Sequence, residues 1–115
     1  MIPGLEQVVV PREKVEGYLL SFTHRTGRSK AEFFSRFGFM AGSWEKLARA
    51  LVRHAAANEV AKTEDSAFGK RYIIEGPLDA PDGRGPLVRS VWFVEQGQTA
   101  PHFVTAYPVP RRTKS

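Results

Sequence analysis

The sequence predicts an α+β domain in which N-terminal helices pack on an antiparallel sheet of about four strands. Apolar residues recur at helical spacing in the first half of the chain, whereas the second half contains short runs rich in β-branched and aromatic residues. Glycine, proline and aspartate separate these runs at short intervals. Such punctuation is typical of strands joined by tight connections, so we expect a meander with the helices on one face.

The helices are expected in residues 12–20, 29–37 and 44–57. The last of these has the clearest pattern, because Leu47 and Leu51 belong to a broad apolar stripe. Ser43 is a candidate N-cap of this helix, and Asn58 is a candidate C-cap. His54 interrupts the apolar pattern, and we interpret it as a surface residue.

The strands are expected in the runs EVAKTEDS, KRYIIEGPL, PLVRSVWFVEQG and HFVTAYPVP, with a hairpin turn at Asp82-Gly83. Side chains of a strand alternate between its two faces. Ser90 and Trp92 should therefore share one face, and Arg89 should lie on the other.

The last run, residues 102–110, carries two hydroxyl-bearing side chains at alternate positions. Thr105 and Tyr107 should share one face, and Val104 should point to the core together with its alternate neighbour Ala106. By the same count, His102 should lie on the face of Val104.

Composition favours a polyanionic partner. The 115 residues include 17 Lys and Arg against 12 Asp and Glu, for a formal charge of +5. We expect one domain over residues 1–110, followed by a basic disordered tail at 111–115. The chain has no cysteine, which excludes disulfides and thiolate metal sites. No apolar run has the length of a membrane span and no signal-peptide pattern is present, so we expect a cytoplasmic protein without membrane contact.

The stretch THRTGRSKAEFF, residues 23–34, places an imidazole and several cations at the start of a predicted helix. Cations near His24 favour its neutral form, which is the form that a general base needs. Gly27 permits a tight turn, after which the helix N-terminus, Arg28 and Lys30 could hold a phosphate. The alternative is a loop histidine beside solvated cations.

Arg71 and Arg89 lie inside predicted strands, where they face either solvent or a ligand-binding surface. Thr105 and Tyr107 could hydrogen-bond phosphate oxygens or stack on a base, or could reflect ordinary strand propensity. There is no HExxH motif and no cluster of carboxylates, so we expect no metal and no cofactor. A serine hydrolase is not expected either, because no GxSxG motif is present.

The pieces YLLSFTH, GRSKAEFF, FGKRYIIEGPL, PDGR, LVRSVWFVEQG and HFVTAYPVP follow one another across residues 12–109. In this order they resemble a small bacterial domain family of uncharacterised function with the pattern YLL…HPxGxxKAxFF…VRxVW…FVTAYP. Arg25 departs from the pattern, since the family often has proline there. The order of elements is also similar to the metal-independent ribonuclease fold of colicin D, RelE-type toxins and the C-terminal toxin domains of contact-dependent inhibition proteins.

This resemblance implies an endoribonuclease toxin that cleaves RNA, for example tRNA, by attack of a 2′-hydroxyl on the phosphate. It casts His24 as the base or acid and makes Lys30 and Arg89 phosphate ligands. Thr105 and Tyr107 would orient the phosphate, with Tyr107 as a second proton donor or a stacking partner. The remaining implied substrate contacts are Gly27, Arg28, Arg71 and Trp92. The resemblance also implies a small acidic antitoxin or immunity protein as partner.

Two other functions fit the same residues. A non-catalytic nucleic-acid-binding domain would use the same basic face without needing His24. A protein-interaction module of the antitoxin or immunity type would need neither, although a basic chain argues against it, because partners that mask a cationic nuclease site tend to be acidic.

Overall fold

The computed structural model of the chain describes residue 2, residues 4–21, residue 23 and residues 28–109. Its fold is α+β, with helices first and a four-stranded antiparallel sheet after them, which confirms the predicted fold class. The helical elements are η1 (Leu5–Gln7), α1 (Arg12–Lys14), η2 (Val15–Leu19), α2 (Arg28–Arg36), η3 (Ala41–Ser43) and α3 (Trp44–Ala57). The strands are β1 (Val60–Ser66), β2 (Gly69–Pro77), β3 (Leu87–Glu95) and β4 (His102–Pro108).

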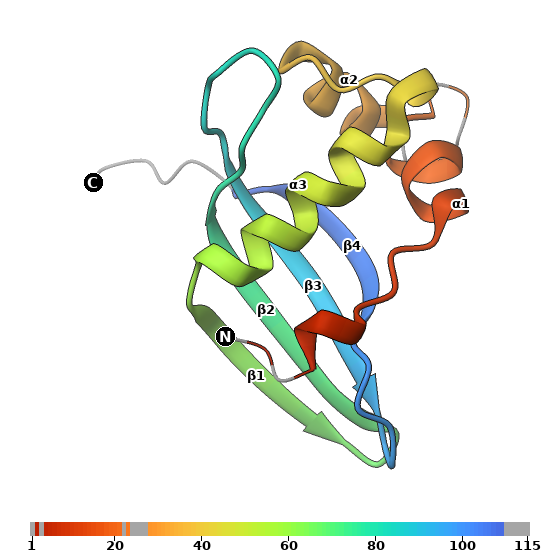
Figure 1. The fold of residues 1–115 in the computed structure, drawn as a ribbon, viewed down its shortest axis with the longest axis vertical. Helices are drawn as coiled ribbons and strands as arrows, with labels where there is room; N and C mark the ends of the chain where they lie inside the picture. Colours follow the sequence, from red (N-terminus) through yellow and green to blue (C-terminus); the bar gives the residue numbers. More distant parts are fainter. Residues whose placement is uncertain (1, 3, 22, 24–27, 110–115) are drawn as a thin grey trace.

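The sheet is a meander, because each strand pairs antiparallel with the next one along the chain, in the order β1-β2-β3-β4. Figure 1 shows α3 lying across one face of this sheet, with α1 and α2 gathered near the N-terminal end of α3. We call the face covered by α3 the inner face and the opposite one the outer face.

Helix α3 is held on the inner face by its apolar stripe. Leu47, Leu51 and Ala55 are buried, and their spacing of about one helical turn puts them on one side. They join a core cluster that includes Phe34 of α2 and Trp92 of β3. Each fully buried Leu or Phe stabilises the fold by roughly 1.5–3 kcal/mol, so this packing fixes α3 against the sheet.

His54 corrects the interpretation of a surface residue, because it is only 2% exposed. Its Nδ1 lies 2.9 Å from Ser90 Oγ, and its Nε2 lies 2.9 Å from the carbonyl oxygen of Val88. Trp92 Nε1 donates to Ser90 Oγ at 2.8 Å. The Ser90 hydroxyl therefore donates to Nδ1, and the Nε2–H group donates to the carbonyl. This pairing needs a neutral imidazole, and burial lowers the pKa of His54 accordingly.

Strand β4 contains a bulge that reverses the direction of its first side chain. Val91 pairs with Thr105, but the next residue of β3 pairs with Phe103, which leaves Val104 as an extra residue. The core position therefore belongs to Phe103, which is buried, and Val104 is only half-buried. The expectation that Val104 points to the core is therefore wrong. His102 lies on the outer face, because it alternates with the inward-pointing Phe103 and pairs with Phe93.

Candidate functional site

The predicted strand residues gather on the outer face. Because Ser90 points to the inner face, its neighbour Arg89 points outward, and so do the residues paired with Arg89. These partners are Glu75 on β2 and Tyr107 on β4. We call Glu75, Arg89 and Tyr107 the arginine row, because they lie side by side across three strands.

Arg89 is held from both sides within this row. Its guanidinium forms an ion pair with the Glu75 carboxylate, and its Cζ lies 5.6 Å from the centroid of the Tyr107 ring. Hydrogen bonding with the Tyr107 side chain, followed by that with Glu75, raises the pKa of Arg89 above its ordinary value. The Arg89 and Glu75 side chains are 31% and 36% exposed, so this permanent cation is accessible from solvent.

Thr105 lies beside the row on the same face, since it precedes Tyr107 by two positions on β4. Its Oγ1 atom is buried and has no hydrogen-bond partner among the described residues. This is unusual, because buried polar groups nearly always have a partner. The Thr105 hydroxyl could therefore still donate and accept a hydrogen bond. A cation, a phenol and a spare hydroxyl therefore lie together on one face of the sheet.

Arg71 lies on the outer face, further along β2. It pairs in register with Phe93 and approaches the Glu64 carboxylate at 3.7 Å. The four positions between Arg71 and Glu75 correspond to about 13 Å along a strand. Arg71 therefore adds a second arginine–glutamate pair to the outer face, beyond the arginine row.

Lys30 lies on α2 and contacts an aromatic residue of another helical element. Its Nζ lies 5.3 Å from the centroid of the Tyr18 ring in η2. Helix α2, which carries Lys30, contacts β4, the strand of Thr105 and Tyr107. The fold thus places this lysine on an element adjacent to the strand that carries the predicted hydroxyl groups.

Other predicted site residues cannot be located in this way. His24 and Gly27 lie outside the described residues, and so does the side chain of Arg28, although its backbone begins α2. Their roles remain predictions from the sequence.

Trp92 lies on the inner face, not with the other candidates. It is fully buried and packs edge-to-face against Phe103, with ring centroids 5.3 Å apart. A direct substrate contact at Trp92 is incompatible with this position in the core. The alternation along β3 had already separated Trp92 from Arg89, and that alternation was the better guide.

Glu75 is an outer-face residue to which sequence reasoning gave no role. Glu75 becomes significant only through the β2–β3 register, which places its carboxylate opposite Arg89. With the register of the β2–β3 hairpin known, the pairing of Glu75 with Arg89 could have been predicted from the sequence. His102 reaches this face because of the β4 bulge, and no local sequence signal marks that bulge.

Neither a metal centre nor a membrane span is found in the part of the chain that the structure describes. No group of three or more His, Cys, Asp or Glu side chains there could hold a metal ion. No helix there is long and apolar enough to cross a membrane.

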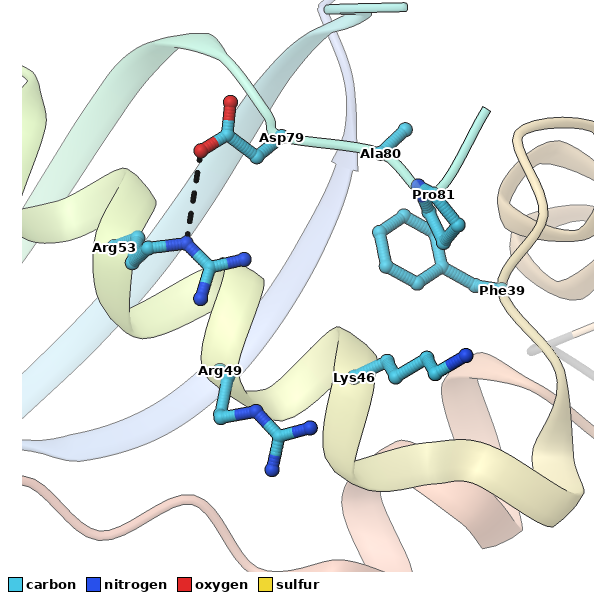
Figure 2. A pocket seen from close by; sticks show the side chains of 7 residues that line it. All are labelled: Phe39, Lys46, Arg49, Arg53, Asp79, Ala80 and Pro81. Carbon is cyan, nitrogen blue, oxygen red and sulfur yellow. Dashed lines mark ion pairs between the residues drawn. The ribbon is translucent and has the colours of Figure 1, made fainter. Parts of the chain in front are cut away.

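A second basic surface lies on the solvent side of α3, across the sheet from the outer face. Lys46, Arg49 and Arg53 border a cavity of about 340 Å³ that is completed by Phe39 and the loop after β2 (Figure 2). Arg53 Nε lies 3.6 Å from an oxygen of Asp79 in that loop. Among the described lining residues there is no histidine or tyrosine. The cavity thus combines three cations with the single carboxylate of Asp79 among the residues that the structure describes there.

Comparison with solved structures shows a similar fold in one chain of a contact-dependent growth inhibition toxin–immunity protein complex from Klebsiella pneumoniae 342. The TM-score is 0.68 at 20% sequence identity, over 88% of this chain and 99% of that chain. A comparison with curated proteins finds no match. The model of a family described as a domain of unknown function, DUF6883, matches residues 1–110, and the chain therefore belongs to the DUF6883 family.

Proposed function

We propose that this chain is a metal-independent endoribonuclease of the toxin type, with the outer face of the sheet as its RNA-binding surface. The observation that carries the proposal is the arginine row, in which a cation is fixed between a carboxylate and a phenol on an accessible sheet face. The formal charge of +5 supports it, as does the fold similarity to a chain of a toxin–immunity complex.

The proposed reaction is transesterification within RNA. The 2′-oxygen attacks the adjacent phosphorus and loses its proton to a general base. The bond between phosphorus and the 5′-oxygen breaks, and a general acid protonates that oxygen. The products are a 2′,3′-cyclic phosphate and a 5′-hydroxyl. Each proton-transfer group contributes about 10²–10⁴-fold to the rate, and each well-placed charge-stabilising donor a comparable factor.

Arg89 would stabilise the negative charge that builds on the phosphate oxygens. A guanidinium has five N–H donors, so pairing with Glu75 on one side leaves donors for a phosphate on another. Glu75 would thereby orient Arg89 instead of neutralising it completely. Tyr107 would protonate the leaving oxygen or stack on a base. Thr105 could bind the phosphate after the side chains that cover its hydroxyl move aside.

The remaining roles are proposed from the sequence alone. His24 would act as the general base, and Lys30 would be a second phosphate ligand from the helical side. Gly27, Arg28 and Arg71 would contact the substrate around the reaction centre.

The decisive experiment is cleavage of total tRNA in EDTA by the wild type and three variants. We expect His24→Ala and Arg89→Ala to lower the cleavage rate by at least about 100-fold. Arg12→Ala is the matched control, because Arg12 is also paired with a glutamate, Glu16, but lies on α1. It should cleave at the wild-type rate, and the products should carry cyclic phosphate ends.

The outcomes separate the alternatives. Equal cleavage by the wild type and Arg89→Ala would exclude the arginine row as the active site. RNA binding without cleavage by a folded wild-type protein would instead support the non-catalytic binding function. Circular dichroism of each variant excludes loss of folding as the cause.

A protein partner is part of the same proposal. The similar structure is described as a toxin–immunity protein complex. An acidic immunity or antitoxin protein would pair with the arginines of the outer face and block their access to RNA. Co-expression with a small acidic protein encoded by a neighbouring gene should abolish tRNA cleavage, and a stoichiometric complex should be isolated.

A further inference from the structure

The outer face continues beyond the arginine row into a hollow beside the start of α1. This hollow has a volume of about 370 Å³, which lies within the range of small-ligand sites. Its lining includes Lys14, Arg71, Phe93, Glu95 and His102. The bulge in β4 is what brings His102 to this lining, and the segment entering α1 closes its other side.

Phe93 lines this hollow together with Phe103, but Phe103 is buried in the core. The Phe93 side chain is half-buried and also borders a second hollow of about 460 Å³ beside Glu64 and Asp65. The ring tip lies over the backbone of Gly69, because a Cβ atom built there would approach Phe93 Cζ to 2.7 Å. An aromatic ring covering a strand glycine is a structural device. Covering Gly69 explains the position of the Phe93 ring, but it does not explain the cations beside the ring.

Basic groups approach the ring from separate elements. Lys14 Nζ donates to the carbonyl oxygen of Val104 at 3.2 Å, which fixes the ammonium at the rim. The Arg71 side chain is 51% exposed despite its ion pair with Glu64, and His102 is exposed. An aromatic surface with cations beside it is an arrangement that binds single-stranded nucleic acid, because bases stack on the ring while cations neutralise the phosphates. Glu95 adds one carboxylate to the same lining.

We propose that this hollow is a nucleotide subsite, in which Phe93 stacks on a base of single-stranded RNA and Arg71, Lys14 and His102 contact its phosphate. The subsite rests on the proposed function of the outer face. Phe93 lies four positions from Arg89 along β3, which is about 13 Å. The subsite therefore holds a nucleotide near the cleaved one, not the cleaved one itself.

The test uses a fluorescein-labelled single-stranded RNA with 2′-O-methyl groups. This RNA lacks the attacking hydroxyl, so binding is measured without cleavage by fluorescence anisotropy. We expect Phe93→Leu to raise Kd by about 5- to 100-fold, the effect of losing one stacked base. Phe93→Tyr keeps an aromatic ring and should remain within about two-fold of the wild type. Melting temperatures of both variants verify that they are folded.

A pair of neighbouring residues gives a charge-matched control that does not depend on Phe93. Arg71 and Lys70 are adjacent, exposed and paired with acids of β1, but they point to opposite faces. Arg71→Ala should weaken binding and lower the salt slope, d log K/d log[salt], by about 0.7 in magnitude. Lys70→Ala should change neither quantity.

The results distinguish this inference from the proposed function. If Arg89→Ala weakens binding but folded Phe93→Leu and Arg71→Ala do not, the subsite is excluded while the arginine row stands. If Arg71→Ala and Lys70→Ala weaken RNA binding equally, binding depends on overall charge and not on the outer face, which would also exclude the subsite. If the wild type does not bind the RNA, the proposed function and the subsite both fall.

Discussion

The inner and outer faces of β3 carry polar groups that are satisfied in different ways. On the inner face, Ser90 and Trp92 form a closed set of hydrogen bonds with His54. On the outer face, Arg89 is paired with Glu75 and Tyr107 but remains accessible to solvent. The two arrangements occupy alternate residues of one strand.

This difference separates stability from the proposed function along a single strand. A buried polar group without a partner costs about 1–3 kcal/mol, so the inner set must be complete. Exposed ion pairs contribute only about 0–1 kcal/mol, so the outer row can exchange partners with a ligand at little cost. Substitutions on the inner face should therefore act on the free energy of unfolding, and those on the outer face should act on RNA.

His54→Ala should have the largest effect on stability. It removes a buried ring and leaves Ser90 and the Val88 carbonyl without their partner, so we expect a loss of about 3 kcal/mol. Urea denaturation followed by tryptophan fluorescence measures this loss. Arg53→Ala, on the exposed side of the same helix, should cost less than about 1 kcal/mol. Equal costs for the two variants would contradict the comparison.

Gly76→Ala tests how tightly the inner face is packed, because the added methyl group would clash with a neighbouring side chain. A Cβ atom at Gly76 would lie 2.1 Å from Asn58 Oδ1. The same Asn58 side chain donates from Nδ2 to the His54 carbonyl at 2.9 Å, at the end of α3. Displacing the Asn58 side chain breaks this bond, so we expect a loss of about 1–2 kcal/mol. Gly17→Ala meets no atom within 4 Å and should not destabilise the protein. Thermal denaturation of the two variants gives the comparison.

Acidification should lower the free energy of unfolding by less than the two inner-face substitutions do. Burial lowers the pKa of His54 below its ordinary value of 6.5, so the unfolded chain binds the proton more tightly than the folded protein does. The contribution of His54 is complete above pH 6.5 and decreases as the pH falls from 6.5 toward the folded pKa. Unfolding free energies between pH 8 and pH 5 should show this decrease, and His54→Gln should flatten it. An unchanged slope in His54→Gln would assign the decrease to other groups.

Glu75→Gln should have only a small effect on stability, below about 1 kcal/mol, because the pair that it breaks is partly exposed. Removal of this carboxylate lowers repulsion toward phosphate, so binding of the 2′-O-methyl RNA should tighten a few-fold. Cleavage should nevertheless slow, since Arg89 loses its orienting partner. Glu16→Gln breaks the equivalent pair between α1 and η2 and should alter neither property. If Glu75→Gln binds RNA more weakly, the orientation of Arg89 by Glu75 matters more for binding than the repulsion between Glu75 and phosphate.

Periodicity was sufficient to predict the architecture. The helical stripe around Leu47 and the alternation of Ser90 and Trp92 each reflect one buried face, and both are confirmed. The same stripe includes position 54, which lies seven residues after Leu47 on the same side of the helix. His54 was misplaced because residue type was given more weight than position, and its partners are distant in sequence.

The candidate site was predictable only in part. Alternation brings Thr105 and Tyr107 to one face, and the strand position of Arg89 is consistent with its exposure. The pairing of Arg89 with Glu75 depends on hairpin register, and the exposure of His102 depends on a bulge. Both are set by tertiary packing of the sheet, which a single sequence does not encode in any local pattern.

The single backbone bridge between Val9 and β4 has a consequence for association between chains. Val9 donates to the Pro101 carbonyl at 2.9 Å and accepts from the Phe103 N–H at 2.9 Å, so the N-terminal segment occupies part of the open edge of β4. The other open edge, on β1, is defended instead by charged residues such as Lys62 and Asp65. Unprotected strand edges invite pairing with further chains. Val9 therefore covers backbone groups at this part of the β4 edge, and its removal would leave them open to pairing with other copies of the chain.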